Sequence, residues 1–281
     1  MKAAEAKTRV AFSNILFATD LSYLADAALP YVLETARLYG SKVHAVHVRQ
    51  RGAPWARPEE NAVASLSERL KAVPHEVLVQ DGETLPTLLQ QIVEKSIDLV
   101  VVSTHGRTGL GRVLLGSVAE AIFREAPCPV LTVGPHLVRD PQWVLKIKEI
   151  LYATDLAPTS AGAANYAISL AQENQARLSI LNVQAVPRAG EIVESEHYAT
   201  STLRRLQQLV PDEAQLWCEP YCLVEQGDTA EKILDVAARY HADLIVLGIR
   251  PHAVGVATHV SRPTAHRVVA GATCPVLTVR S

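Results

Sequence analysis

The segment at residues 103–117, STHGRTGLGRVLLGS, combines residue types that suit phosphate binding. Its glycines let the backbone approach a ligand closely, and backbone N–H groups in a tight loop or at a helix start form an anion site. Ser117 adds a hydroxyl donor, and Arg107 and Arg112 add positive charge. The glycine spacing is neither that of a dinucleotide fingerprint nor that of a P-loop, which also needs a lysine. These residues alone leave two interpretations open, a phosphate-binding loop and a permissive turn.

The chain around this segment is a tandem repeat. NILFATDL at 14–21 and EILYATDL at 149–156 share six of eight residues, and CPVLTV at 128–133 recurs unchanged at 274–279. A period near 140 residues is too long for a solenoid, so it indicates a duplicated domain. We therefore expect two domains, at residues 1–137 and 145–281, joined by a linker around 134–143.

In each half, short apolar runs alternate with stretches of helical periodicity. Strands are predicted at 15–18, 42–48, 76–79, 99–102 and 129–133, and at 150–153, 178–183, 221–224, 244–247 and 275–279. Helices are predicted at 25–38, 60–72, 85–95 and 113–124, and at 160–172, 195–209 and 229–240, the last with Asp228 and Glu231 in a capping-box spacing. This alternation predicts an α/β fold with a parallel sheet covered by helices on both faces. Ligands of such sheets bind beyond the carboxyl ends of the strands, which directs attention to Asp20 and to residues 103–117.

Composition excludes several classes of function. A formal net charge of −2 argues against a nucleic-acid-binding protein, for which a basic stripe is expected. No apolar run approaches the roughly 18 residues of a membrane span, and the first twenty residues lack the pattern of a secretory signal. Four cysteines are too few for a disulfide scaffold, so we expect a reduced, cytoplasmic protein with Cys128 and Cys274 as buried thiols.

The repeat resembles the universal stress protein family, in tandem form, over nearly the whole chain. ATP-binding members of that family carry G-x2-G-x9-G-(S/T) after the fourth strand, and this chain has Ser103, Gly106, Gly116 and Ser117 at those positions. The THGR context and the APCPVLTV run also match. Three of the four positions agree, and Ser103 replaces the first glycine. Strain at Ser103 is expected only if its φ is positive.

The resemblance implies two Rossmann-like domains, each with a five-stranded parallel sheet in the order 3-2-1-4-5. It implies ATP as the ligand of the first domain, with ADP or AMP as alternatives, and a magnesium ion that Asp20 would contact through the nucleotide. The nucleotide-binding residues carried over from the family are Ala18, Thr19, Asp20, Val48, Val102, Ser103, His105, Gly106, Gly116, Ser117 and Val118.

The second half departs from this pattern. Gly248 stands where Ser103 stands in the first half, but Pro251 and Arg262-Pro263 replace the later glycines and serine. Asp155 is kept. A proline removes an N–H group that would face phosphate, so we expect this half to be structural or regulatory. His252, His259 and His266 recur every seven residues there, and the alternatives are a polar loop and a zinc site. His44 and His47, three apart on a strand, should face opposite ways.

Three functions stay open. The first is a stress-response regulator that binds an adenine nucleotide. The second is a slow ATPase or phosphotransferase, which would need an oriented general base that the sequence does not reveal. The third is a ligand-free scaffold. In each case the last strands of the two domains, 130–133 and 276–279, should pair as an intramolecular pseudo-dimer, because sheet edges are normally covered. A homodimer of whole chains also stays open.

Overall fold

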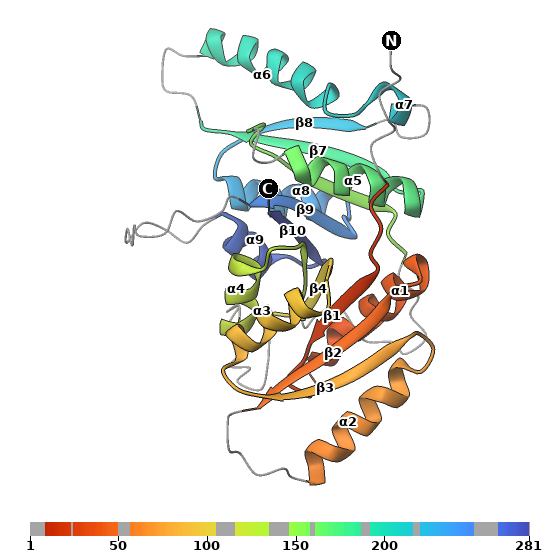
Figure 1. The fold of residues 1–281 in the computed structure, drawn as a ribbon. Helices are drawn as coiled ribbons and strands as arrows, with labels where there is room; N and C mark the ends of the chain where they lie inside the picture. Colours follow the sequence, from red (N-terminus) through yellow and green to blue (C-terminus); the bar gives the residue numbers. More distant parts are fainter. Residues whose placement is uncertain are drawn as a thin grey trace.

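The computed structural model describes residues 9–23, 25–49, 57–104, 116–134, 146–157, 161–186, 192–215, 220–249 and 264–280. They form one continuous sheet of ten strands in the order β3-β2-β1-β4-β5-β10-β9-β6-β7-β8, with helices on both faces (Figure 1). Each half has the predicted order 3-2-1-4-5 and is parallel within itself. The expectation of a five-stranded sheet in each half is corrected to one ten-stranded sheet, because β5 and β10 hydrogen-bond to each other and merge the two sheets.

The first half follows the predicted alternation closely. Its strands are β1 (Asn14–Ala18), β2 (Lys42–Arg49), β3 (His75–Asp81), β4 (Leu99–Ser103) and β5 (Val130–Val133). Its helices are the short 3-10 helix η1 (Ala25–Ala28), α1 (Leu29–Tyr39), α2 (Arg57–Leu70), α3 (Thr84–Glu94) and α4 (Ser117–Glu125).

The second half repeats the first. Its strands are β6 (Glu149–Ala153), β7 (Arg177–Gln184), β8 (Tyr221–Gln226), β9 (Leu244–Ile249) and β10 (Val276–Arg280). Its helices are α5 (Ala161–Asn174), α6 (Ile192–Gln207), α7 (Asp212–Gln215), α8 (Thr229–Arg239) and α9 (Thr264–Gly271). The predicted cap of α8 is confirmed, because the Asp228 carboxylate accepts a hydrogen bond of 3.0 Å from the Glu231 N–H.

The two halves meet along β5 and β10, which run antiparallel. Leu131 pairs with Leu277, its equivalent in the repeat, so the local pseudo-two-fold axis passes between them. Two threonine hydroxyls reinforce the junction reciprocally. Thr132 Oγ1 donates to the Val276 carbonyl at 3.1 Å, and Thr278 Oγ1 donates to the Val130 carbonyl at 3.2 Å. The predicted intramolecular pairing is thereby confirmed, whereas association of two chains stays a prediction.

Strands buried on both sides divide the core into two layers. Along β4, Leu99 and Val101 face the layer of α1, α2, α5 and α6, while Val100 and Val102 face the layer of α3, α4, α8 and α9. This alternation is the period of two expected for a strand, and both sets are apolar because helices cover both faces. Within the described residues, no helix is long and apolar enough to cross a bilayer.

The segment before β1 reaches across to the second half. The Val10 N–H donates to Ser169 Oγ of α5 at 3.0 Å, and Arg9 forms an ion pair with Glu173 of the same helix. Phe12 stacks on Tyr166 of α5, with ring centroids 6.2 Å apart and planes inclined by 22°. The junction therefore includes helix and chain-segment contacts as well as the shared sheet.

Candidate functional site

A cavity of about 280 Å³ lies at the carboxyl ends of β1, β2 and β4, where α4 begins. Nine of the eleven predicted binding residues line it, namely Ala18, Thr19, Asp20, Val48, Val102, Ser103, Gly116, Ser117 and Val118. The other two, His105 and Gly106, lie outside the described residues. The sheet thus brings together residues that are about 100 positions apart in the sequence.

A tight turn after β1 presents Asp20 to this cavity. The Asp20 carboxylate accepts a hydrogen bond from the Ser22 N–H at 2.9 Å, and Thr19 Oγ1 accepts one from the Leu21 N–H at 3.0 Å. These bonds hold Leu21 at a φ of 60°, in the left-handed region. Asp20 therefore shapes the backbone locally and also lines the cavity.

The second half has the same turn after β6, although it lacks the signature found at Gly106, Gly116 and Ser117 in the first half. Asp155 accepts from the Ala157 N–H at 3.0 Å, Thr154 Oγ1 accepts from the Leu156 N–H at 3.0 Å, and Leu156 has a φ of 58°. The turn alone is thus a structural feature common to both halves. The turn therefore does not distinguish the two halves, whereas Gly116 and Ser117, at the start of α4, belong to the signature that only the first half carries.

The other side of the cavity is the start of α4. Gly116 is the residue immediately before the helix, in an extended conformation, and its N–H donates to the Thr104 carbonyl at 2.7 Å. A Cβ atom at Gly116 would lie 3.1 Å from that carbonyl oxygen, so glycine suits this close approach. The sequence predicted a helix over 113–124 with Gly116 inside it. The structure corrects this, since the helix begins at Ser117 and Gly116 marks its N-terminal boundary.

The first N–H groups of α4 belong to Ser117, Val118 and Ala119, and all three residues line the cavity. Such groups have no carbonyl partner within their own helix, and the helix dipole adds positive potential there. Ser103 lies opposite, at the end of β4, in register with Val133. The φ of Ser103 is not positive, so serine in place of the family's glycine causes no backbone strain here.

Comparison with known proteins agrees with this geometry. The model of the universal stress protein family matches residues 11–134 and again 146–280. This chain belongs to the universal stress protein family. A universal stress protein of Mycolicibacterium smegmatis is 26% identical, with 95% of this chain and 97% of the relative covered. One from Methanocaldococcus jannaschii is 30% identical over 43% of this chain and 82% of its own length.

The fold agrees as well. The crystal structure of a universal stress protein from Archaeoglobus fulgidus superimposes with a TM-score of 0.71. That comparison covers 95% of this chain and 98% of the other at 17% sequence identity, so it supports the arrangement of the two halves and no more.

Five further residues of this universal stress protein line the cavity and were not predicted from the sequence. They are Ala25 of η1, Val46 of β2, Thr84 and Leu88 of α3, and Ala119 of α4. The helical periodicity of residues 85–95 indicated that α3 has a buried face. It gave no signal that the first two turns of that face reach the cavity, because this depends on how α3 crosses the sheet.

The histidines singled out in the sequence differ in their burial and in their hydrogen-bond partners. As predicted, His44 and His47 face opposite ways: His44 Nδ1 hydrogen-bonds to Glu76 at 2.6 Å, and His47 Nδ1 donates to the Thr19 carbonyl at 3.0 Å. His266 lies buried on α9, while His252 and His259 fall outside the described residues. Within the described part of the chain, no three His, Cys, Asp or Glu side chains gather as a metal site would require.

Proposed function

We propose that the first half of this chain binds ATP, or a related adenine nucleotide, as a regulatory ligand, and that the second half is structural or regulatory. The observation that carries the proposal is the cavity in which Asp20, Gly116 and Ser117 come together. The boundaries near residues 137 and 145 then separate a nucleotide-binding domain from its partner.

The cavity offers different chemistry at its two sides. Val48, Val102 and Leu88 supply apolar walls that suit an adenine base. The N-terminus of α4, with the Ser117 hydroxyl, supplies donors that suit phosphate oxygens. Asp20 suits a magnesium ion carried on the phosphates, because carboxylate oxygen is a preferred ligand of that ion.

The residues that line the cavity favour binding of the nucleotide over its hydrolysis. Among the described residues that line the cavity, Asp20 is the only ionisable one. Hydrolysis of a phosphoanhydride requires charge neutralisation and an oriented nucleophile, usually with a base held in place by a third group. Regulation by occupancy needs only that the nucleotide stabilise one form of the domain.

The test is calorimetric titration of the whole chain with ATP and ADP in the presence of magnesium. Asp20→Ala removes a carboxylate from the cavity but also removes a hydrogen bond of the turn. Asp155→Ala removes the same turn bond in the second half and is therefore the matched control. We expect Asp20→Ala to weaken ATP binding by about tenfold or more, and Asp155→Ala to leave it unchanged.

Two results would overturn the proposal. One is the absence of binding heat for the wild-type chain at high micromolar ATP. The other is an equal loss of affinity in both variants, which would assign the effect to the turn. Chromatography of the nucleotide released by denaturing the purified protein gives an independent measurement.

A further inference from the structure

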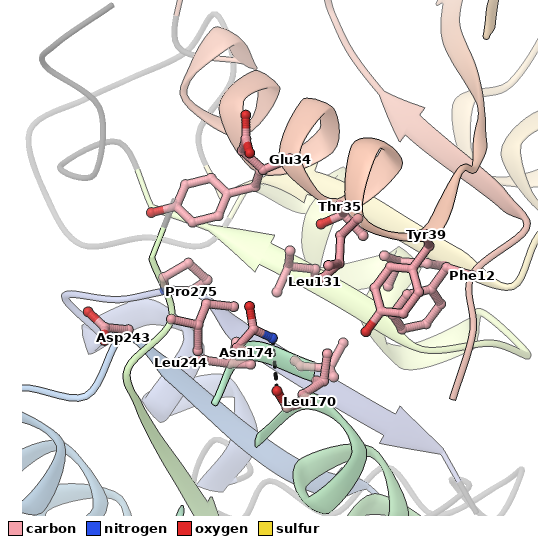
Figure 2. A pocket seen from close by; sticks show the side chains of 15 residues that line it. Phe12, Glu34, Thr35, Tyr39, Leu131, Leu170, Asn174, Asp243, Leu244 and Pro275 are labelled. Atoms are coloured by element: carbon pink, nitrogen blue, oxygen red, sulfur yellow. Dashed lines mark hydrogen bonds between the residues drawn. The ribbon is translucent and has the colours of Figure 1, made fainter. Parts of the chain in front are cut away.

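A second cavity, of about 140 Å³, lies where the two halves meet (Figure 2). It is bounded by α1 of the first half, α5 of the second half, and the sheet between them, and it is partly open to solvent. It shares no lining residue with the cavity near Asp20. Its walls include Leu99 and Leu244, the first residues of β4 and β9, so it lies toward the amino ends of those strands, away from the proposed nucleotide site.

The walls of this junction cavity are mainly aliphatic. They include Leu99, Leu131, Ile147, Leu170, Leu244 and Leu277. An apolar cavity of about 150 Å³ with a comparable lining takes up a benzene molecule. The size and lining therefore suit a molecule with one aromatic ring.

One buried polar group adds a chemical preference. The Tyr39 hydroxyl is buried and has no hydrogen-bond partner in the part of the chain that the structure describes. The ring packs edge-on against Phe12, with centroids 5.1 Å apart and planes at 81°, and in Figure 2 the hydroxyl points away from α1 toward α5. A tyrosine is a neutral hydroxyl donor at pH 7, and burial, which raises the pKa of Tyr39 to about 12, keeps it so in more alkaline solution. A ligand oxygen that accepts this proton would satisfy it.

Two carboxylates set the charge of the lining. Glu34 pairs with Arg37 on α1, and Asp243 accepts hydrogen bonds from the Lys148 and Glu149 N–H groups. Burial, with further contributions from Cys274 and Asp243, raises the pKa of Tyr31 in the same wall. A negative charge at Asp243 disfavours a second anion nearby.

We propose that the junction cavity binds an uncharged molecule with a single aromatic ring and a hydrogen-bond-accepting oxygen, which takes the Tyr39 hydroxyl as its donor. Because the walls come from both halves, such a ligand stabilises the junction between them. The site is independent of the proposed nucleotide site.

Benzyl alcohol is the probe, titrated into the whole chain and followed by ligand-detected NMR and by the unfolding temperature. We expect saturable binding and a rise in the unfolding temperature. Tyr39→Phe keeps the ring and removes the donor, so it should weaken binding about fivefold, the size expected for one lost hydrogen bond. Tyr198→Phe, at a residue that is 58% exposed on α6, is the matched control and should bind as the wild type does. Benzoate should bind at least about tenfold more weakly.

A third variant tests the location. Leu170→Phe places a ring in the cavity from α5 and should abolish binding. Tyr39→Phe provides the test if Leu170→Phe does not fold. The proposal is overturned if benzyl alcohol shows no saturable binding, if Tyr39→Phe binds as tightly as wild type, or if folded Leu170→Phe still binds. Displacement by ATP would also overturn it, because the probe would then occupy the other cavity.

Discussion

His266 Nε2 of α9 lies 3.5 Å from Glu120 Oε2 of α4, across the junction between the two halves. The two residues are 146 positions apart, the offset that also relates the two CPVLTV runs, so they are equivalents in the repeat. If two copies of the first half paired in the same way, Glu120 would lie against a second Glu120, and two copies of the second half would place His266 against His266. Here a carboxylate meets an imidazole, which favours pairing of the first half with the second.

Charge at this position should therefore control the stability of the junction. His266→Glu places two carboxylates together at a site where the wild-type side chain is only 7% exposed, and should lower the free energy of unfolding by about 2 kcal/mol or more. The swapped double variant, His266→Glu with Glu120→His, restores the complementary pair and should recover most of the loss. Urea denaturation at pH 6 measures both. A double variant no more stable than His266→Glu would contradict the role of the pair.

Ser103 should be compatible with nucleotide binding. Because its φ is not positive, Ser103→Gly relieves no strain and should change ATP affinity by less than about twofold. It should lower the free energy of unfolding by about 0.5–1 kcal/mol, since glycine is less favourable in a strand. Titration calorimetry and urea denaturation check the two expectations, with Ser103→Ala as a control that keeps the Cβ atom. A large gain in affinity on Ser103→Gly would show that serine hinders the ligand.

Acid should weaken the fold through Glu76 of β3. Hydrogen bonds from Lys95 foremost, and also from His44 and Lys42, lower the pKa of Glu76 to about 2. A carboxyl whose pKa is lower in the folded state than its ordinary value of 4.5 stabilises the fold above that value, and this contribution is lost as the pH falls toward 2.

Glu76→Gln should accordingly be less stable than wild type by about 1–2 kcal/mol at pH 6, with the gap closing between pH 4.5 and 2. Urea midpoints measured across that range give the gap directly. Glu68→Gln, at an exposed carboxylate paired with Lys71, is the control and should show little pH dependence relative to wild type. A gap that stays constant down to pH 2 would contradict the assignment.

The cysteines before β5 and β10 should be unreactive in the folded protein. Burial raises the pKa of Cys128 and of Cys274 to about 12. At pH 8 both groups are then overwhelmingly neutral thiols, whereas the thiolate is the reactive form, and Cys274 is the more buried of the two. Mass spectrometry after iodoacetamide treatment should find these two sites largely unmodified in buffer and fully modified in urea. Rapid modification of Cys274 in the folded state would contradict this.

The sequence predicted the path of the chain well because few topologies satisfy its pattern. Repeated strand and helix signals predicted a parallel sheet with helices on both faces, and the strand order observed in each half is the one that the resemblance to the universal stress protein family implied. The apolar PVLTV runs identified the two edges that pair, and this pairing joins the two five-stranded sheets into one. The sequence pattern did not specify the antiparallel register that places Leu131 opposite Leu277.

For the candidate site too, some features could be predicted from the sequence and others could not. The spacing from Ser103 to Ser117 identified residues that converge, because strand ends and the next helix start must meet at one edge of the sheet. The start of α4 was placed too early, since the apolar residues before Gly116 continue the helical period and glycine offers no side-chain cap as a signal. The junction cavity had no sequence signal at all. Phe12, Tyr39 and Leu170 come from three separate segments, and only the packing of two halves brings them together.

The antiparallel contact between β5 and β10 also imposes an order on events during synthesis. The ribosome completes β5 at Val133 but does not complete its partner until Arg280. At 5–20 residues per second, the first half spends roughly 7–30 s with the β5 edge uncovered. An open apolar edge is a site for pairing with another chain. During that interval the uncovered β5 of one nascent chain can pair with the β10 of a neighbouring chain on the same polysome, which would exchange halves between the two chains.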